Sequence, residues 1–278
     1  MKLKIFALAF SVCFVFCFSA AAFFVFRFSK PLEQSLEEQE EAVFLEVESA
    51  SFLLVYEEEG AFGPFTIVNF DAKAGRIPVF TFSKNAAFDY GGVTVSAGAL
   101  FSSVSPEVFA GAVETNLGIE LCGYFIWNRE SAEAIIGKTG GFDYVLPEEL
   151  YYRGGTSFVH LLAGVQNMTA KKICDVITYP KFSEGERCDV SSRMAACFFN
   201  RRLKRFLPES GVYPILFNYT KTDISAFDKE KYAKLAEVLC SSGGSLASHI
   251  TNDTEKDVNT GLLYFSDTTK NRVKKYFG

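Results

Sequence analysis

The stretch 116–147 combines two spacings of apolar residues, one of about 3.6 positions and one of two, and it organises the prediction for the whole chain. It predicts, in order, the end of a helix at Leu117, a strand over 119–127, a helix over 129–136 and a strand over 142–146. Gly118 is a suitable helix terminator because glycine adopts the left-handed conformation readily. Asn128 is a suitable N-cap for the second helix. The unit is typical of an α/β fold.

The same spacings predict further elements on both sides of this unit. Strands are expected over 51–56, 65–70, 77–82, 158–162, 176–179, 215–219 and 262–265, and helices over 105–117, 170–175, 192–206, 226–240 and 266–278. The polar segment 181–189 contains Gly185 and is interpreted as a loop. Because strands and helices alternate, we expect one α/β domain with a central mixed β-sheet flanked by helices on both faces.

The N-terminal run over 5–26 is uncharged and apolar, and it contains neither Pro nor Gly. A helix of 22 residues is about 33 Å long, and the hydrocarbon core of a bilayer is about 30 Å thick. Small residues at 19–22 leave a cleaved signal peptide as an alternative. The apolar run continues past them, and its length favours an uncleaved membrane anchor.

This anchor suggests a single-pass protein of the cell membrane. Lys2 and Lys4 precede the run, so the positive-inside rule places residues 1–4 in the cytoplasm. The predicted order is then a transmembrane anchor over 5–26, an acidic juxtamembrane stalk over 27–50 and an extracytoplasmic domain over 51–278. Membrane lipid is thus an expected partner.

Composition excludes some classes of function. The chain has 278 residues, of which 49% are hydrophobic and 22% charged, and such a chain buries a sizeable core. Its formal net charge is -5. A nucleic-acid-binding surface needs a clustered positive field, so nucleic acid is not an expected partner.

Few residues are available for histidine or thiol chemistry. His160 and His249 are the two histidines, which excludes a histidine-based metal cluster. His160 lies in an apolar run and is interpreted as a packed or edge residue, and His249 is placed in a polar loop. Five of the seven cysteines lie outside the N-terminal run, without a Cys-x-x-Cys spacing. They are interpreted as buried small hydrophobic residues, with one disulfide as an alternative.

Arg187 and Arg193 flank the start of the predicted helix over 192–206. Guanidinium groups at a helix start can bind an anion such as a phosphate. The competing interpretation is that both side chains are solvated surface residues.

The order of these segments resembles the LytR-CpsA-Psr family of the bacterial cell envelope from about Phe52 to Gly278. The residues that carry the resemblance are Asn116-Leu117-Gly118-Ile119, Tyr124-Phe125, Ala134-Ile135-Ile136, Gly140-Gly141, Val145-Leu146-Pro147 and Leu162-Ala163-Gly164-Val165-Gln166-Asn167-Met168-Thr169. The resemblance implies a phosphotransferase that moves anionic glycopolymers from undecaprenyl pyrophosphate to peptidoglycan, usually with Mg²⁺. It also implies a groove for the lipid.

The residues expected for this chemistry are mostly replaced. Lys84-Asn85 stands where the family has an Arg-Asp pair, so the bidentate guanidinium and the carboxylate are both absent. Glu57 is the one acidic residue near the expected cation-binding positions. The family's arginine-bearing strand falls at 177–180, which has no arginine, and Arg193 remains from the pair expected at the next helix.

Two hypotheses follow from this pattern. In the first, the chain is a divergent member with reduced or absent catalysis that binds a polyprenyl-phosphate or glycan-type ligand. In the second, it is an active transferase that uses Lys84, Arg187 and Arg193 on the phosphates and Glu57 on Mg²⁺. Losing several charged groups that act together costs orders of magnitude in rate, so the sequence favours the first hypothesis and assigns no catalytic residue. It names no certain cofactor.

Overall fold

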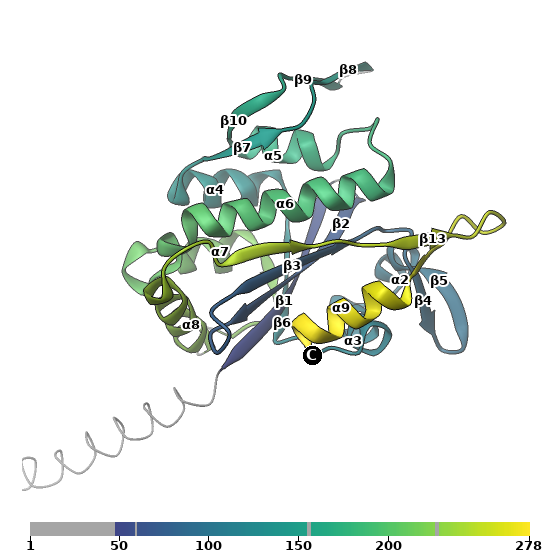
Figure 1. Cartoon of the computed structure of the whole chain (residues 1–278), viewed down its shortest axis with the longest axis horizontal. Helices are drawn as coiled ribbons and strands as arrows, with labels where there is room; N and C mark the ends of the chain where they lie inside the picture. The colour runs from purple at the N-terminus through teal and green to yellow at the C-terminus, as the bar shows by residue number, and fades with distance from the viewer. Residues whose placement is uncertain (1–47, 59, 155–156, 226–227) are drawn as a thin grey trace, which may run out of the picture. The chain divides into compact units, whose positions relative to one another are not determined.

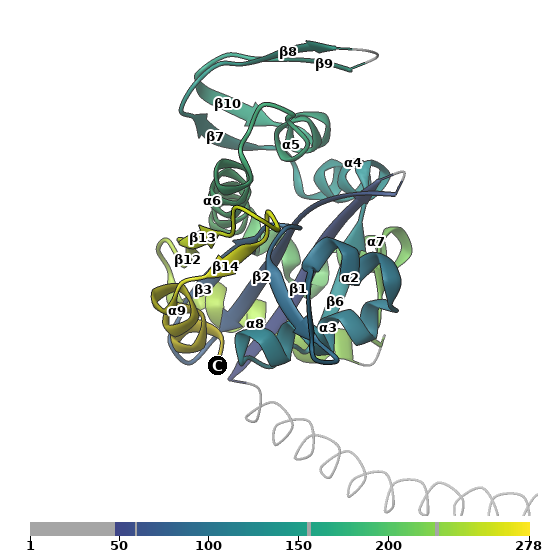
Figure 2. The same cartoon turned by 90° about the vertical axis from the view of Figure 1, so that its right-hand side faces the viewer.

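A mixed six-stranded sheet forms the centre of the computed structural model (Figures 1 and 2). Its strands, in spatial order, are β11 (Lys221–Thr222), β6 (Gly123–Trp127), β1 (Ser49–Glu58), β2 (Ala61–Asp71), β3 (Ile77–Phe82) and β12 (Ala247–Ile250). β1 pairs with β6 and β3 with β12 in parallel, and the other pairs are antiparallel. The α/β class and the mixed sheet predicted from the sequence are confirmed.

The structure describes residues 48–58, 60–154, 157–225 and 228–278. The predicted membrane span over 5–26 and nearly all of the predicted stalk lie outside these residues. Within the described ranges, every helix is too short or too polar to span a bilayer.

Three helices cover one face of the sheet: α2 (Ala97–Ser103), α3 (Pro106–Leu117) and α9 (Asp267–Phe277). This side is packed by aromatic rings, with Phe65, Phe82 and Phe109 each fully buried. The Phe65 and Phe109 rings lie 4.8 Å apart between centroids, and those of Phe65 and Phe82 5.3 Å apart. Burying rings of this size dominates the energetics of a core, so this face supplies much of the stability of the domain.

The opposite face is covered by a larger set of helices: α4 (Arg129–Thr139), α5 (Ala170–Ile177), α6 (Glu184–Arg202), α7 (Tyr213–Tyr219) and α8 (Asp228–Ser242), with the short 3-10 turns η1 (Leu203–Phe206) and η2 (Pro208–Ser210). α6 is held across the sheet by a hydrogen bond from Ser192 Oγ to the carbonyl of Val79, at 3.0 Å. Helices therefore flank both faces, as the sequence predicts.

Four two-stranded ribbons complete the described fold: β4 (Ala87–Tyr90) with β5 (Val93–Ser96), β7 (Phe142–Leu146) with β10 (Gly164–Met168), β8 (Leu150–Gly154) with β9 (Ser157–Leu161), and β13 (Thr254–Lys256) with β14 (Leu263–Phe265). β7 to β10 extend away from the central sheet beyond α5 (Figure 2). They are called the arm below.

The predicted 116–147 unit is present as the end of α3, then β6, α4 and β7. Gly118 has φ 66°, the left-handed conformation that terminates α3. Asn128 accepts a hydrogen bond from the backbone NH of Ser131 at 2.9 Å and caps α4. The strand is shorter than expected, because residues 119–122 form the connection that leads into β6.

Several other predicted elements are wrong. Residues 176–179 and 215–219 were expected to be strands, yet they lie at the end of α5 and in α7. α6 begins at Glu184 rather than at 192, because Ser183 and Glu186 form a capping box and Gly185 fits inside the first turn. His249 is in β12 rather than in a loop, paired with Val79.

A hydrogen bond between buried Tyr124 of β6 and Glu107 of α3 makes the stability of the protein depend on pH. Tyr124 Oη donates to Glu107 Oε1 at 2.6 Å. This hydrogen bond to the charged form is the main cause that lowers the pKa of Glu107 from 4.5 to about 2. Because the folded-state pKa is the lower one, the resulting stability is present above pH 4.5 and is lost as the pH falls towards 2.

We therefore expect Tyr124→Phe to destabilise the protein at pH 6, with a difference from the native protein that shrinks below pH 4.5. Urea unfolding followed by fluorescence at several pH values measures this difference. Tyr264→Phe is the matched control, since Tyr264 is 43% exposed. A destabilisation by Tyr124→Phe that does not change with pH contradicts the assignment.

Candidate functional site

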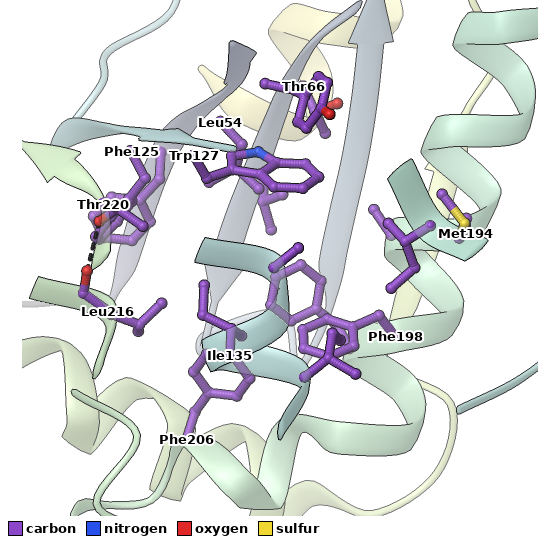
Figure 3. A pocket seen from close by; sticks show the side chains of 18 of the residues that line it. Leu54, Thr66, Phe125, Trp127, Ile135, Met194, Phe198, Phe206, Leu216 and Thr220 are labelled. Carbon is purple, nitrogen blue, oxygen red and sulfur yellow. Dashed lines mark hydrogen bonds between the residues drawn. The ribbon is translucent and has the colours of Figure 1, made fainter. Parts of the chain in front are cut away.

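An apolar cavity of about 250 Å³ lies between the central sheet and helices α4 to α8. Figure 3 shows side chains from the sheet and from these helices pointing into one open space. Its walls are mostly aliphatic and aromatic, and they include Leu54, Phe125, Trp127, Ile135, Met194, Phe198, Phe206 and Leu216.

The cavity follows from the alternation of side chains along β1 and β2. Leu54 and Tyr56 point towards α4 to α8 and line the cavity, whereas Leu53 and Val55 belong to the aromatic core on the other face. Thr66 on β2 also faces the cavity, and its hydroxyl is already hydrogen-bonded to that of Thr81 at 3.0 Å. The cavity thus offers hydrocarbon contacts and few polar partners.

Helix α7 forms one wall of the cavity and is only partly buried. Tyr213, Leu216 and Phe217 line the cavity, yet α7 has no fully buried residue and no side-chain N-cap. Short helices depend on tertiary packing for their stability. The end of α7 is tied to α4 by Ser131 Oγ, which donates to the carbonyl of Tyr219.

A cluster of four charged side chains lies beside the end of the cavity that Tyr56 lines, and we call it the charged end. Tyr56 Oη donates to Glu58, whose carboxylate is 3.4 Å from the Arg129 guanidinium. Arg129 is also 3.9 Å from Asp175, and Asp175 is 2.5 Å from Lys171. Two cations face two carboxylates, so the cluster has no net charge.

Burial controls the protonation of the neighbouring groups. It raises the pKa of Tyr56, with the hydrogen bond to Glu58 acting in the same direction. Burial also raises the pKa of the Cys174 thiol to about 11, against the opposing effect of Arg129. Both groups are therefore neutral at physiological pH, and Cys174 is a poor nucleophile.

The four sequence-predicted site residues do not converge on one site. Lys84 is exposed just after β3 and lies against α2, where Gly98 donates its backbone NH to the Lys84 carbonyl at 2.7 Å. The preceding Ser83 donates its hydroxyl to Glu184 at 2.5 Å, and Glu184 lies 3.7 Å from Arg187 on α6. The Arg187 guanidinium also donates to the carbonyl of Ile177 at 2.7 Å.

Glu57 and Arg193 are separate from that pair. Glu57 is half-buried near the end of β1, where the strand alternation turns it away from the cavity face that Tyr56 and Glu58 share. Arg193 is half-exposed and pairs with Asp189 on its own helix, at 3.0 Å. Over the described ranges, no hydrogen bond or ion pair joins either residue to Lys84 or Arg187.

The described residues contain no group of three His, Cys, Asp or Glu side chains that could hold a metal ion. Glu57 offers one carboxylate at the position considered for Mg²⁺, so the other ligands of a bound Mg²⁺ would have to be water and substrate phosphates. His160 is exposed on β9 and lies 2.8 Å from Glu149. The five cysteines in the described part of the chain are free.

Sequence reasoning missed the residues of the charged end. Glu58, Arg129, Lys171 and Asp175 come from β1, α4 and α5, which are far apart in the chain. Glu58 was passed over for Glu57, although i and i+2 residues share a strand face and Tyr56 was already assigned to the sheet. A buried aspartate within α5 was the other available signal, because such a group needs partners.

The fold matches known structures with little sequence identity. TagV of Bacillus subtilis matches with a TM-score of 0.64 and 14% identity, over 82% of this chain and 95% of that one. A Eubacterium siraeum protein provisionally described as a transcription regulator matches with a TM-score of 0.73 and 15% identity, over 82% and 91%. TagU of B. subtilis matches with a TM-score of 0.57 and 10% identity, over 82% of this chain and 95% of that one. No protein-family model and no curated protein sequence matches the chain.

TagU and TagV are LytR-CpsA-Psr proteins. This chain has the LytR-CpsA-Psr-like fold. At identities of 10% to 15%, the likeness concerns the fold and not the chemistry of a site. The fold that the sequence resemblance implied is therefore confirmed, and function must be argued from the residues of the cavity and its charged end.

The protonated state of Cys174 can be tested by alkylation at pH 8. We expect maleimide to label Cys122, which is exposed, and to leave Cys174 unlabelled until the protein is unfolded, because Cys174 is buried with a pKa of about 11. Peptide mass spectrometry measures both sites in one sample. Labelling of Cys174 as fast as Cys122 in the folded protein would show a reactive thiolate instead.

Proposed function

We propose that the chain is a membrane-anchored, extracytoplasmic protein of the bacterial cell envelope that binds a polyprenyl-phosphate or related glycolipid. The hydrocarbon chain lies in the cavity, and the polar group lies towards the charged end. In this proposal phosphotransfer is reduced or absent. The membrane anchor rests on the apolar run over 5–26.

The cavity is the observation that carries the proposal. This space of about 250 Å³ is partly open to solvent, and its walls are almost entirely apolar. Water finds few partners there, because an ordered water needs about two to four polar contacts. A hydrocarbon ligand would bury its own surface along with that of the walls, which is favourable by about 25 cal/mol per Å² of apolar surface.

The charges around the cavity favour binding over transfer. Pyrophosphate transfer requires cations free to meet the charge that develops on the phosphates. Arg129 and Lys171 are each paired with a carboxylate, and Arg187 donates to a backbone carbonyl. A phosphate must compete with these carboxylates and with the carbonyl for the cations. This competition weakens the stabilisation of a phosphoryl-transfer transition state, and it has less effect on the binding of the hydrocarbon tail of a lipid.

An active phosphotransferase is the alternative, in which Lys84, Arg187 and Arg193 act on the phosphates. The positions of these cations do not favour it, because Lys84 lies against α2 and Arg187 lies on α6, on opposite faces of the sheet. Glu57 would supply a carboxylate for Mg²⁺ in that mechanism, with water and substrate phosphates as the other ligands.

Filling the cavity should weaken lipid binding. Ala195 lines the cavity, and we expect Ala195→Trp to weaken binding of polyprenyl phosphate by about tenfold or more, equivalent to ~1.4 kcal/mol. Native mass spectrometry of the full-length protein measures the retained lipid. Val108→Trp is the control, because Val108 is 42% exposed on α3 over the other face of the sheet. Equal binding by both variants would place the lipid elsewhere.

Turnover distinguishes the two hypotheses. We expect the full-length protein with lipid-linked pyrophosphate glycan, peptidoglycan and Mg²⁺ to release polyprenyl phosphate no faster than a sample without protein. The alternative predicts release that is lost in Lys84→Ala, Arg187→Ala or Arg193→Ala. Release that requires these side chains would replace the binding role with an enzymatic one.

A further inference from the structure

The arm carries a concentration of exposed apolar side chains. Five of the twelve large hydrophobic residues exposed in the described part of the chain lie within it, each with 47% to 69% of its surface accessible. They are Val145, Tyr151, Phe158, Leu162 and Val165. Isolated exposed hydrophobic residues need no explanation, but a group of them on one projecting element marks an interaction surface.

The pairing of the strands places these residues on shared faces. Val145 and Val165 are direct partners across β7 and β10. On the β8–β9 hairpin, Tyr151 is paired with His160 and Arg153 with Phe158, and the Tyr151 and Phe158 rings are 6.2 Å apart. Leu150, Val159 and Leu161 point the other way and are buried. The outer face of the hairpin is thus aromatic and partly basic.

This outer face has the composition of a membrane-interface surface. Aromatic rings and long basic side chains are the groups that settle at the headgroup level of a bilayer. Arg153 is exposed on this face, and Lys181 donates from Nζ to the Tyr151 carbonyl at 2.9 Å. Glu148, Glu149 and Glu186 lie around Tyr151 and Lys181, and Glu149 pairs with His160, so this face has no excess of positive charge. Its aromatic rings, rather than its charge, suit it to the surface of a bilayer.

The hairpin is tied to the same end of the domain as the charged end of the cavity. Tyr179 Oη donates to the Tyr151 carbonyl at 3.0 Å, two residues after Ile177, which lines the cavity. α5 carries Ile177 as well as Asp175 and Lys171 of the charged end. A bilayer in contact with the hairpin would therefore lie near the charged end, where the polar group of the lipid is proposed to bind.

The chain outside the described residues allows this orientation. Residues 27–47 separate the apolar run over 5–26 from Glu48, and this stretch of 21 residues reaches at most about 70 Å when extended. A domain of 231 residues, from Glu48 to Gly278, has a radius of gyration of about 17 Å. The connection is long enough for any side of the domain to meet the bilayer.

We propose that the outer face of the β8–β9 hairpin docks on the surface of a lipid bilayer, with Tyr151 and Phe158 inserted at the headgroup level. This rests on the proposed function for the presence of the membrane, but not on occupancy of the cavity. Docking turns the charged end towards the bilayer and shortens the path of a lipid into the cavity.

Quenching by brominated lipid tests the docking directly. The full-length protein, with Trp127→Phe to remove its one tryptophan, receives either Phe158→Trp or Val258→Trp and is reconstituted into phosphatidylcholine vesicles. Val258 is the matched control, 91% exposed and outside the arm. We expect brominated acyl chains to quench most of the emission at position 158 and little of that at position 258.

Equal quenching at the two positions would overturn the proposal. A second result would also overturn it: tryptophan emission at position 158 that shifts to the blue only when many protein molecules share a vesicle. That dependence would show that a second copy of the chain covers the hairpin. Neither readout needs a lipid in the cavity, and the Ala195→Trp binding assay needs no vesicles. Failure of docking and failure of lipid binding are therefore separate results.

Discussion

The pleat of β1 is the constraint on which the rest of this structure depends. Leu53 and Val55 pack into the aromatic core on one face, and Leu54 and Tyr56 line the cavity on the other. Because alternate residues of a strand point to opposite faces, one register decides both environments. The densely packed side can support a cavity on the other side, since its buried phenylalanine rings provide stability that does not depend on the cavity.

The charged end is a set of paired charges beside an apolar cavity. Arg129 is within ion-pair distance of Glu58 and Asp175, and Lys171, whose side chain is two-thirds exposed, pairs with Asp175. Exposed ion pairs contribute little to stability, so the main consequence of the pairing is that an anion must compete with the carboxylates for these cations. Apolar contact in the cavity depends instead on shape and area. The likeness to TagU and TagV is one of fold, and it assigns neither a ligand nor a reaction to the cavity.

The errors in the predicted elements have a common physical origin. Residues 215–219 form a short apolar run, and periodicity alone cannot distinguish a buried strand from a helix over five residues. α7 is a helix that begins with Pro214 in its first turn and places its side chains against the cavity. By contrast, the start of α6 was readable, because Ser183 and Glu186 have the spacing of a capping box.

The sequence by itself determined the elements whose signals are local: the hairpin of β2 and β3, the caps at Ser105 and Asn128, and the terminator at Gly118. Each depends on residues a few positions apart. Only the tertiary structure decided the cavity and its charged end, because Glu58, Arg129 and Asp175 are brought together by the pairing of β1 with β6 and by the packing of α4 against α5. It also decided between Glu57 and Glu58, since the face that an acid occupies depends on strand register, and that register is set by contacts with distant strands.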